Sequence, residues 1–162
     1  MDVEEITSSA TGRIRVLVAD DHPVVRAGLV AVIAEQTGMA LVAQAENGER
    51  AVTQFREHRP DVVLMDLRMP VMDGVEAIRA ITAEFPAARI LALTTYEGDP
   101  DIRRALEAGA RGYLLKDMLL TEVVTAVHAV RRGERVLPVT VAARPAEGPE
   151  RRRIAPERSP LR

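Results

Sequence analysis

The chain has 162 residues, of which 47% are hydrophobic and only 2% aromatic, and its net charge is −2. This length is enough for one domain with a core of aliphatic side chains, and the small net charge indicates neither nucleic acid nor a membrane surface as a direct partner. The absence of cysteine excludes disulfides, thiolate metal sites and a cysteine nucleophile, and it fits a cytoplasmic protein.

Five short apolar runs recur along the chain and are separated by segments with helical spacing. The runs cover residues 14–19, 39–45, 62–65, 90–93 and 112–115. Each has the length of a strand, and near-continuous apolar runs are typical of parallel strands buried on both faces. Strands that alternate with helices predict a parallel sheet covered by helices on both sides.

The segments between and after the runs predict five helices. Pro23 suits the first turn of a helix, where no backbone N–H is needed. Asn47-Gly48 is a turn signal before a helix over about residues 49–58, and Asp73 is expected to cap the next helix just before Gly74. Apolar residues at helical spacing indicate two more helices, from Ile102 and from Val123.

The alternating pattern defines one domain over residues 13–132. Residues 1–12 are polar and acidic, unlike a signal peptide, and we expect a flexible leader. Residues 133–162 hold five of the ten prolines and are expected to form a linker or tail that is largely disordered. Residues 136–143 are the part of this tail that can add a strand or a helical turn. No apolar run reaches the roughly 20 residues that span a bilayer.

Three acidic residues stand at the ends of predicted strands. Asp20 and Asp21 follow the first run, and Asp66 follows the third. Open parallel sheets bind ligands at the carboxyl ends of their strands. Clustered carboxylates either raise a pKa or hold a divalent cation, and a set of oxygen ligands favours Mg²⁺. A carboxylate that faces Mg²⁺ can also attack phosphorus and form an aspartyl phosphate.

Two further polar residues end predicted strands. Thr94 ends the fourth strand, and its hydroxyl can donate to a phosphoryl oxygen. Lys116 ends the fifth strand, and its ammonium can pair with the same group. A single pocket at the carboxyl edge of the sheet is therefore expected to collect these two side chains and the three acids.

Five stretches resemble the receiver domain of two-component response regulators and together span about residues 13–132. They are VLVADDHPVVRAGL, AENGERAV, DVVLMDLRMPVMDG, ILALTTY and GARGYLLKD. The resemblance implies an α/β fold of the flavodoxin-like, doubly wound (βα)5 class, with a parallel five-stranded sheet in the order 2-1-3-4-5. It also implies a signalling protein rather than an enzyme, with only Mg²⁺-dependent self-phosphorylation and autodephosphorylation.

The resemblance assigns a role to each matching residue. It implies that Asp66 is the phosphoacceptor and that Thr94 and Lys116 contact the phosphoryl group. The implied ligands of Mg²⁺ are Asp20, Asp21, Asp66 and the backbone carbonyl of Arg68, and the implied switch residues are Thr94 and Tyr113. A sensor histidine kinase is the expected donor, and phosphorylation is expected to change the face made by the fourth helix, fifth strand and fifth helix. A homodimer is one expected readout.

The stretches ADDHPVVRAGL and LLKD resemble a subfamily that carries a C-terminal helix-turn-helix of the LuxR/NarL type. The DNA-binding domain of that subfamily begins about where this chain stops, so control of transcription and DNA binding are expected only through an output domain absent from this chain. Truncation and natural loss of that domain both stay open. Asp117 follows Lys116 where the family often has a proline in a cis peptide, so the cis bond of the family is not assumed here.

Three alternative functions stay open, and each has a sequence feature against it. A phosphatase of the haloacid-dehalogenase type uses a second acid two residues after its nucleophile, where this chain has Arg68. A nucleotide-binding domain needs a Gly-rich loop after the first strand, but DDHPVVRAG is acidic. A pseudo-receiver that binds a partner without phosphate does not need the complete set of acids. His22 is expected to be an exposed loop residue, although it stands beside the acids.

Overall fold

The computed structural model describes residues 12–137, so most of the expected leader and tail lies outside the described residues. Five parallel strands form one sheet in the order β2-β1-β3-β4-β5, which confirms the expected fold class. The strands are β1 (Ile14–Ala19), β2 (Met39–Ala45), β3 (Val62–Asp66), β4 (Ile90–Thr94) and β5 (Tyr113–Leu115). Strands β3 and β4 each extend one residue beyond the apolar pattern because polar Asp66 and Thr94 continue the ladder.

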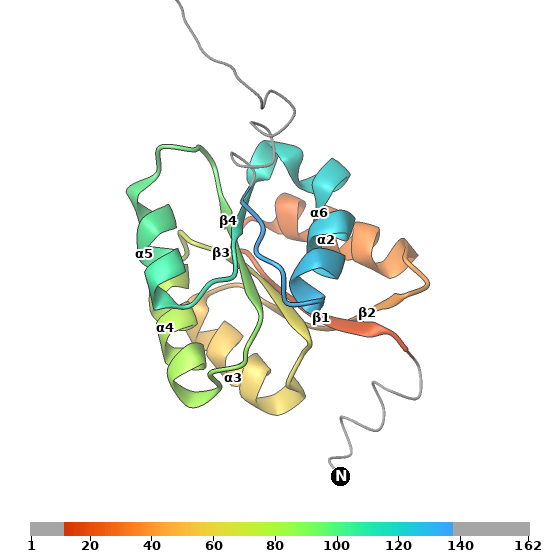
Figure 1. Ribbon diagram of the computed structural model, residues 1–162, viewed down its shortest axis with the longest axis horizontal. Helices are drawn as coiled ribbons and strands as arrows, with labels where there is room; N and C mark the ends of the chain where they lie inside the picture. The colour runs from red at the N-terminus through yellow and green to blue at the C-terminus, as the bar shows by residue number, and fades with distance from the viewer. Residues whose placement is uncertain (1–11, 138–162) are drawn as a thin grey trace, which may run out of the picture.

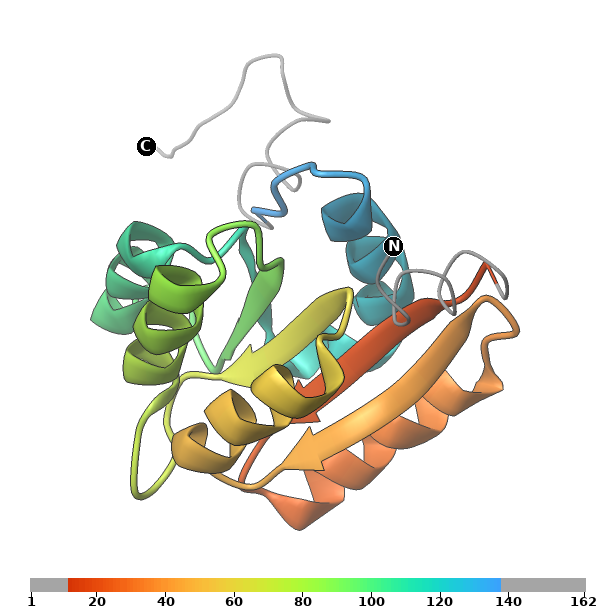
Figure 2. The ribbon, with the colours of Figure 1, turned by 90° about the horizontal axis from the view of Figure 1, so that it is seen from below.

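Helices cover both faces of the sheet (Figures 1 and 2). They are α2 (Pro23–Glu35), α3 (Gly48–His58), α4 (Gly74–Glu84), α5 (Pro100–Ala108) and α6 (Leu119–Arg131), with a short 3-10 turn η1 (Lys116–Met118) before α6. Helices α3, α4 and α5 pack on one face, and α2 and α6 pack on the other. As expected, Asp73 caps α4: its side chain accepts a hydrogen bond from the Glu76 N–H.

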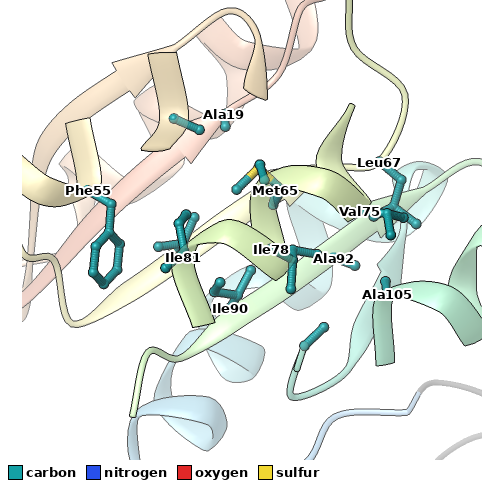
Figure 3. Packing of buried hydrophobic residues seen from close by; sticks show 14 of the residues in the cluster. Ala19, Phe55, Met65, Leu67, Val75, Ile78, Ile81, Ile90, Ala92 and Ala105 are labelled. Carbon is teal, nitrogen blue, oxygen red and sulfur yellow. The ribbon is translucent and has the colours of Figure 1, made fainter. Parts of the chain in front are cut away.

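The sheet separates two apolar clusters because neighbouring residues of each strand point to opposite faces. On one face, Val75, Ile78 and Ile81 of α4 lie over Met65 and Ile90 of the central strands (Figure 3). On the other face, Val18 of β1 and Leu64 of β3 belong to a second cluster. The helices contribute Leu29 and Ile33 of α2 and Val127 of α6 to it. A fully buried aliphatic side chain contributes about 1.5–3 kcal/mol. Burial on both faces therefore fixes the strands and the line of their carboxyl ends.

The chain turns back toward the sheet after α6 (Figure 1, blue). The Tyr113 N–H donates to the Val136 carbonyl at 2.9 Å, and the Val136 N–H donates to the Arg111 carbonyl at 3.0 Å. Val136 packs against the α2/α6 cluster, and Leu137 packs against the opposite cluster. The first residues of the expected tail thus add a short parallel bridge to the edge of β5. No helix among the described residues is long and apolar enough to span a membrane.

Candidate functional site

The three acids of the sequence prediction meet at the carboxyl ends of β1 and β3. These strands are paired neighbours in the sheet, so Asp20, directly after β1, and Asp66, the last residue of β3, end side by side. Asp20 is 0% exposed and Asp66 is 2% exposed, whereas Asp21 is partly exposed. One ligand atom from each of these acids and from His22 lies within 4.8 Å of the others.

Lys116 places its ammonium between the two buried acids. Its Nζ lies 3.0 Å from Oδ2 of Asp66 and 3.3 Å from Oδ2 of Asp20. The residue follows β5 and begins η1, and β5 is two strands away from β3 in the sheet. The long side chain therefore reaches across the ends of the strands, as the sequence analysis expected. One ammonium only partly neutralises three neighbouring carboxylates.

The electrostatic state of Asp66 reflects this excess of negative charge. Burial is the main cause that raises its pKa, and the charge of Asp20 raises it further. The ammonium of Lys116 and the Arg68 N–H act in the opposite direction, yet the pKa of Asp66 is raised to about 6. A second cation at this position would favour the ionised form.

The donor set fits a hard divalent cation. Three buried carboxylate oxygens, Asp20 Oδ2, Asp21 Oδ1 and Asp66 Oδ2, have no hydrogen bond of regular geometry. Their near neighbours are the Lys116 ammonium and the His22 ring. Buried polar atoms normally have a partner, and carboxylate oxygens are the preferred ligands of Mg²⁺. His22 adds a ring whose Nδ1 lies 3.2 Å from Asp21 and 3.9 Å from Asp66. The ring is exposed, as expected, but it also lies against the acids, which the expectation of a simple loop residue did not include.

Thr94 donates its hydroxyl proton away from the acids, to a residue that the sequence analysis missed. Its Oγ1 donates to Oδ2 of Asp99 at 2.7 Å, and the Arg68 guanidinium donates to Oδ1 of the same carboxylate at 2.6 Å. Burial raises the pKa of Asp99, but hydrogen bonds from the Asp101 N–H, Thr94 and Arg68 outweigh it, so the pKa lies below its usual value. The sequence does indicate that Asp99 caps a helix, because an acid directly before a proline, here Pro100, is typical of a helix N-cap.

Tyr113 is also connected to the loop between β4 and α5. The side chain is buried on the face covered by α3, α4 and α5, and its hydroxyl donates to Oε1 of Glu97 at 2.7 Å. Thr94 and Tyr113, which the resemblance pairs as switch residues, thus both hydrogen-bond to residues of one loop. That connection could not be read from the spacing of the sequence.

The loop after β3 holds Asp66 against the start of α4. The Gly74 N–H donates to the Leu67 carbonyl at 2.9 Å, and a Cβ at Gly74 would overlap the Asp66 carbonyl oxygen. Within the loop, the Met72 N–H donates to the Pro70 carbonyl around Val71, whose φ is +71°. This is a γ-turn of the strained kind, and the β-branched Val71 side chain is exposed.

Comparison with known proteins gives concordant results. A family model described as the response regulator receiver domain matches residues 16–128. The chain is 42% identical to the transcriptional regulatory protein LnrK of Bacillus subtilis (strain 168), over 80% of this chain and 59% of that protein. It is 43% identical to the response regulator GacA of Pseudomonas viridiflava, over 80% of this chain and 60% of that protein.

Solved structures agree with this match. A two-component response regulator of the LuxR family from Aurantimonas sp. SI85-9A1 superposes with a TM-score of 0.75 at 39% identity, covering 84% of this chain and 97% of the other. The similar proteins are therefore response regulators of the LuxR/NarL type. The chain spans about three fifths of the length of the two curated relatives.

Proposed function

We propose that this chain, which belongs to the response regulator receiver domain family, accepts a phosphoryl group on Asp66 as the input step of a two-component system. The proposal rests on one observation: the buried Asp66 carboxylate lies beside Asp20 and Asp21, and the Lys116 ammonium is 3.0 Å from its Oδ2. Such a carboxylate can act as a nucleophile toward phosphorus, with Lys116 as one countercharge for the incoming phosphoryl oxygens and Mg²⁺ as the second.

The residues divide the work of the transfer between them. A carboxylate oxygen of Asp66 forms the new bond to phosphorus, and the bond from phosphorus to the donor breaks, with its electron pair leaving on the donor. Lys116, 3.0 Å from Asp66, is placed to pair with a phosphoryl oxygen. Mg²⁺, held by Asp20, Asp21, Asp66 and the Arg68 carbonyl, would offset the charge on the phosphoryl group. Thr94 would donate its hydroxyl proton to another phosphoryl oxygen.

The partners follow from the same proposal. A sensor histidine kinase supplies the phosphoryl group, which places the reaction in the cytoplasm. The response appears on the face formed by α5, β5 and α6, where Tyr113 lies, and it favours either a homodimer or a partner protein. DNA is bound only by an output domain beyond this chain, as the shorter span relative to LnrK and GacA allows.

Intact-mass spectrometry after incubation with acetyl phosphate tests the proposal. We expect one added phosphoryl group in the presence of Mg²⁺, little in EDTA and none in Asp66→Asn. Asp73→Asn is the matched control because Asp73 caps α4 outside the acidic cluster, and asparagine caps equally well. A folded wild-type protein without an adduct would contradict the proposal and favour the pseudo-receiver. An adduct that persists in Asp66→Asn would refute the assignment of the nucleophile.

A further inference from the structure

Asp99 is a buried carboxylate that the proposed transfer does not use. It is 4% exposed, and each of its oxygens accepts a short hydrogen bond. Oδ2 accepts from the Thr94 hydroxyl at 2.7 Å, and Oδ1 accepts from the Arg68 guanidinium at 2.6 Å and from the Asp101 N–H at 2.9 Å. Its role as N-cap of α5 needs only the bond from Asp101. The contacts to Thr94 and Arg68 therefore call for a second explanation.

We propose that Asp99 is a positioning residue that competes with the phosphoryl group on Asp66 for the hydroxyl proton of Thr94. This inference rests on the proposed function. A threonine hydroxyl has one proton and can donate it to one acceptor at a time. In this structure that acceptor is Asp99. Thr94 can serve the phosphoryl group only after it gives up Asp99, so the strength of this bond sets the affinity of the site for a phosphoryl group.

The competing bond is strong for physical reasons. The acceptor is an ionised carboxylate, and the contact is buried, where hydrogen bonds to charged groups contribute more than those between neutral groups. When Thr94 turns away, Oδ2 of Asp99 loses the one partner that the structure gives it, while Oδ1 keeps two. The arrangement without phosphate is thereby favoured, and the phosphoryl group must supply the difference.

Arg68 connects this competition to the phosphoacceptor. Its backbone N–H donates to Oδ1 of Asp66 at 3.3 Å, and its side chain reaches Asp99 and lies 3.6 Å from Asp101. One residue thus contacts the nucleophile through its backbone and the competing acid through its guanidinium. The guanidinium is largely exposed, so we assign it the orientation of Asp99 rather than a large share of the energy.

Asp99→Asn is the sharpest variant because it keeps the size and the capping ability of the side chain and removes its charge. The asparagine can accept from the Asp101 N–H and turn its NH₂ group toward Thr94, which frees the hydroxyl proton. Binding of beryllofluoride, a phosphoryl mimic, is measured by calorimetry at saturating Mg²⁺. We expect about tenfold tighter binding in Asp99→Asn than in the wild type, which corresponds to about 1.4 kcal/mol. Asp99→Ser, which also caps, gives a second test if the first variant does not fold.

A double mutant separates competition from a general structural effect. If Asp99 acts through the Thr94 hydroxyl, then Asp99→Asn changes the affinity by less than about twofold in a Thr94→Val background. Asp101→Asn is the matched control: it removes a neighbouring acid near Arg68 that does not contact Thr94, and it should bind like the wild type.

The outcomes distinguish this inference from the proposed function. Unchanged or weaker binding in folded Asp99→Asn, or an equal gain with Thr94→Val, would overturn the inference and leave phosphorylation of Asp66 intact. A folded wild-type protein that binds no beryllofluoride with Mg²⁺ would overturn both.

Discussion

Asp66 is ionised in the folded protein at a cost that the fold itself creates. Its side chain is buried at the end of β3, beside the fully buried Asp20, and burial and that neighbouring charge together raise its pKa from 3.8 to about 6. The folded state therefore binds a proton more tightly than the unfolded state does between these two values. The free energy of unfolding falls as the pH rises through this range, and the penalty is complete above about pH 6.

Asp66→Asn should therefore stabilise the protein in the absence of divalent cations. We expect the free energy of unfolding to rise by on the order of 2 kcal/mol at pH 7.5. The variant removes a buried charge that is repelled by Asp20 and only partly neutralised by Lys116. The gain should shrink toward pH 4, where the wild-type carboxyl group is itself protonated. Urea unfolding in EDTA at several pH values measures it. A variant that is less stable than the wild type at pH 7.5 would contradict this view of the cluster.

For single residues, the sequence predicts which side chains meet at the ends of strands, but it does not predict which side chains meet through the folding of a loop. Asp20, Asp66 and Lys116 follow apolar runs, and parallel strands bring such positions to one edge of a sheet. Asp99 lies five residues beyond Thr94, and its contact with the threonine depends on how the β4–α5 loop folds back. No periodicity specifies such a loop, so the pattern of the sequence could not identify the acceptor.

At the scale of elements, the edge of β5 is completed by the segment after α6. Gly112 makes this possible, because its φ of +153° is rarely adopted by other residues and a Cβ would overlap the Val136 carbonyl. The bridge involves the backbone of Tyr113, the expected switch residue. The path of the chain toward any following domain is thus joined to β5.

Gly112→Ala should release this segment from β5 while the rest of the fold persists. We expect the amide protons of Tyr113 and Val136 to exchange at least tenfold faster, since both donate across the bridge, and the free energy of unfolding to fall by about 1–2 kcal/mol. Hydrogen exchange followed by NMR measures both effects. Gly38→Ala is the control, because no atom lies within 4 Å of its added Cβ. Equal exchange rates in wild type and Gly112→Ala would show that the bridge does not depend on Gly112.

The elements themselves were largely predictable. Each strand begins and ends within one residue of its apolar run, and α2, α3 and α4 begin within one residue of the positions that Pro23 and the Asn47 and Asp73 turns indicate, because both faces of the sheet are buried. Helices α5 and α6 begin two and four residues before Ile102 and Val123, since apolar spacing marks the buried face of a helix and not its first turn. The bridge at Val136 was foreseen only as a segment that can add structure. Its partner strand depends on the space beside Gly112, which is a property of the folded chain.

For the whole molecule, the order of the strands determines the site. Placing β1 next to β3 brings Asp66 together with Asp20 and Asp21, although more than 40 residues separate Asp66 from this pair along the chain. The order came from the family resemblance, since alternating strands and helices are compatible with other orders. The two apolar clusters then hold β1 and β3 from both faces, so the acids separate only when the sheet itself unfolds.

This arrangement predicts that Mg²⁺ stabilises the entire domain. Because the acids come from the ends of two central strands, the unfolded chain lacks the site, and binding raises the free energy of unfolding by RT ln(1 + [Mg²⁺]/Kd). At tenfold excess over Kd this is about 1.4 kcal/mol, or a rise in Tm of about 3–5 °C. Thermal unfolding by circular dichroism, in Mg²⁺ and in EDTA at matched ionic strength, measures the shift. Asp21→Asn should lose most of it and Asp73→Asn should keep it, since Asp21 contributes a buried oxygen to the cluster and Asp73 is not part of the cluster. A shift of equal size in Asp21→Asn would place the ion elsewhere and remove the electrostatic basis for phosphorylation at Asp66.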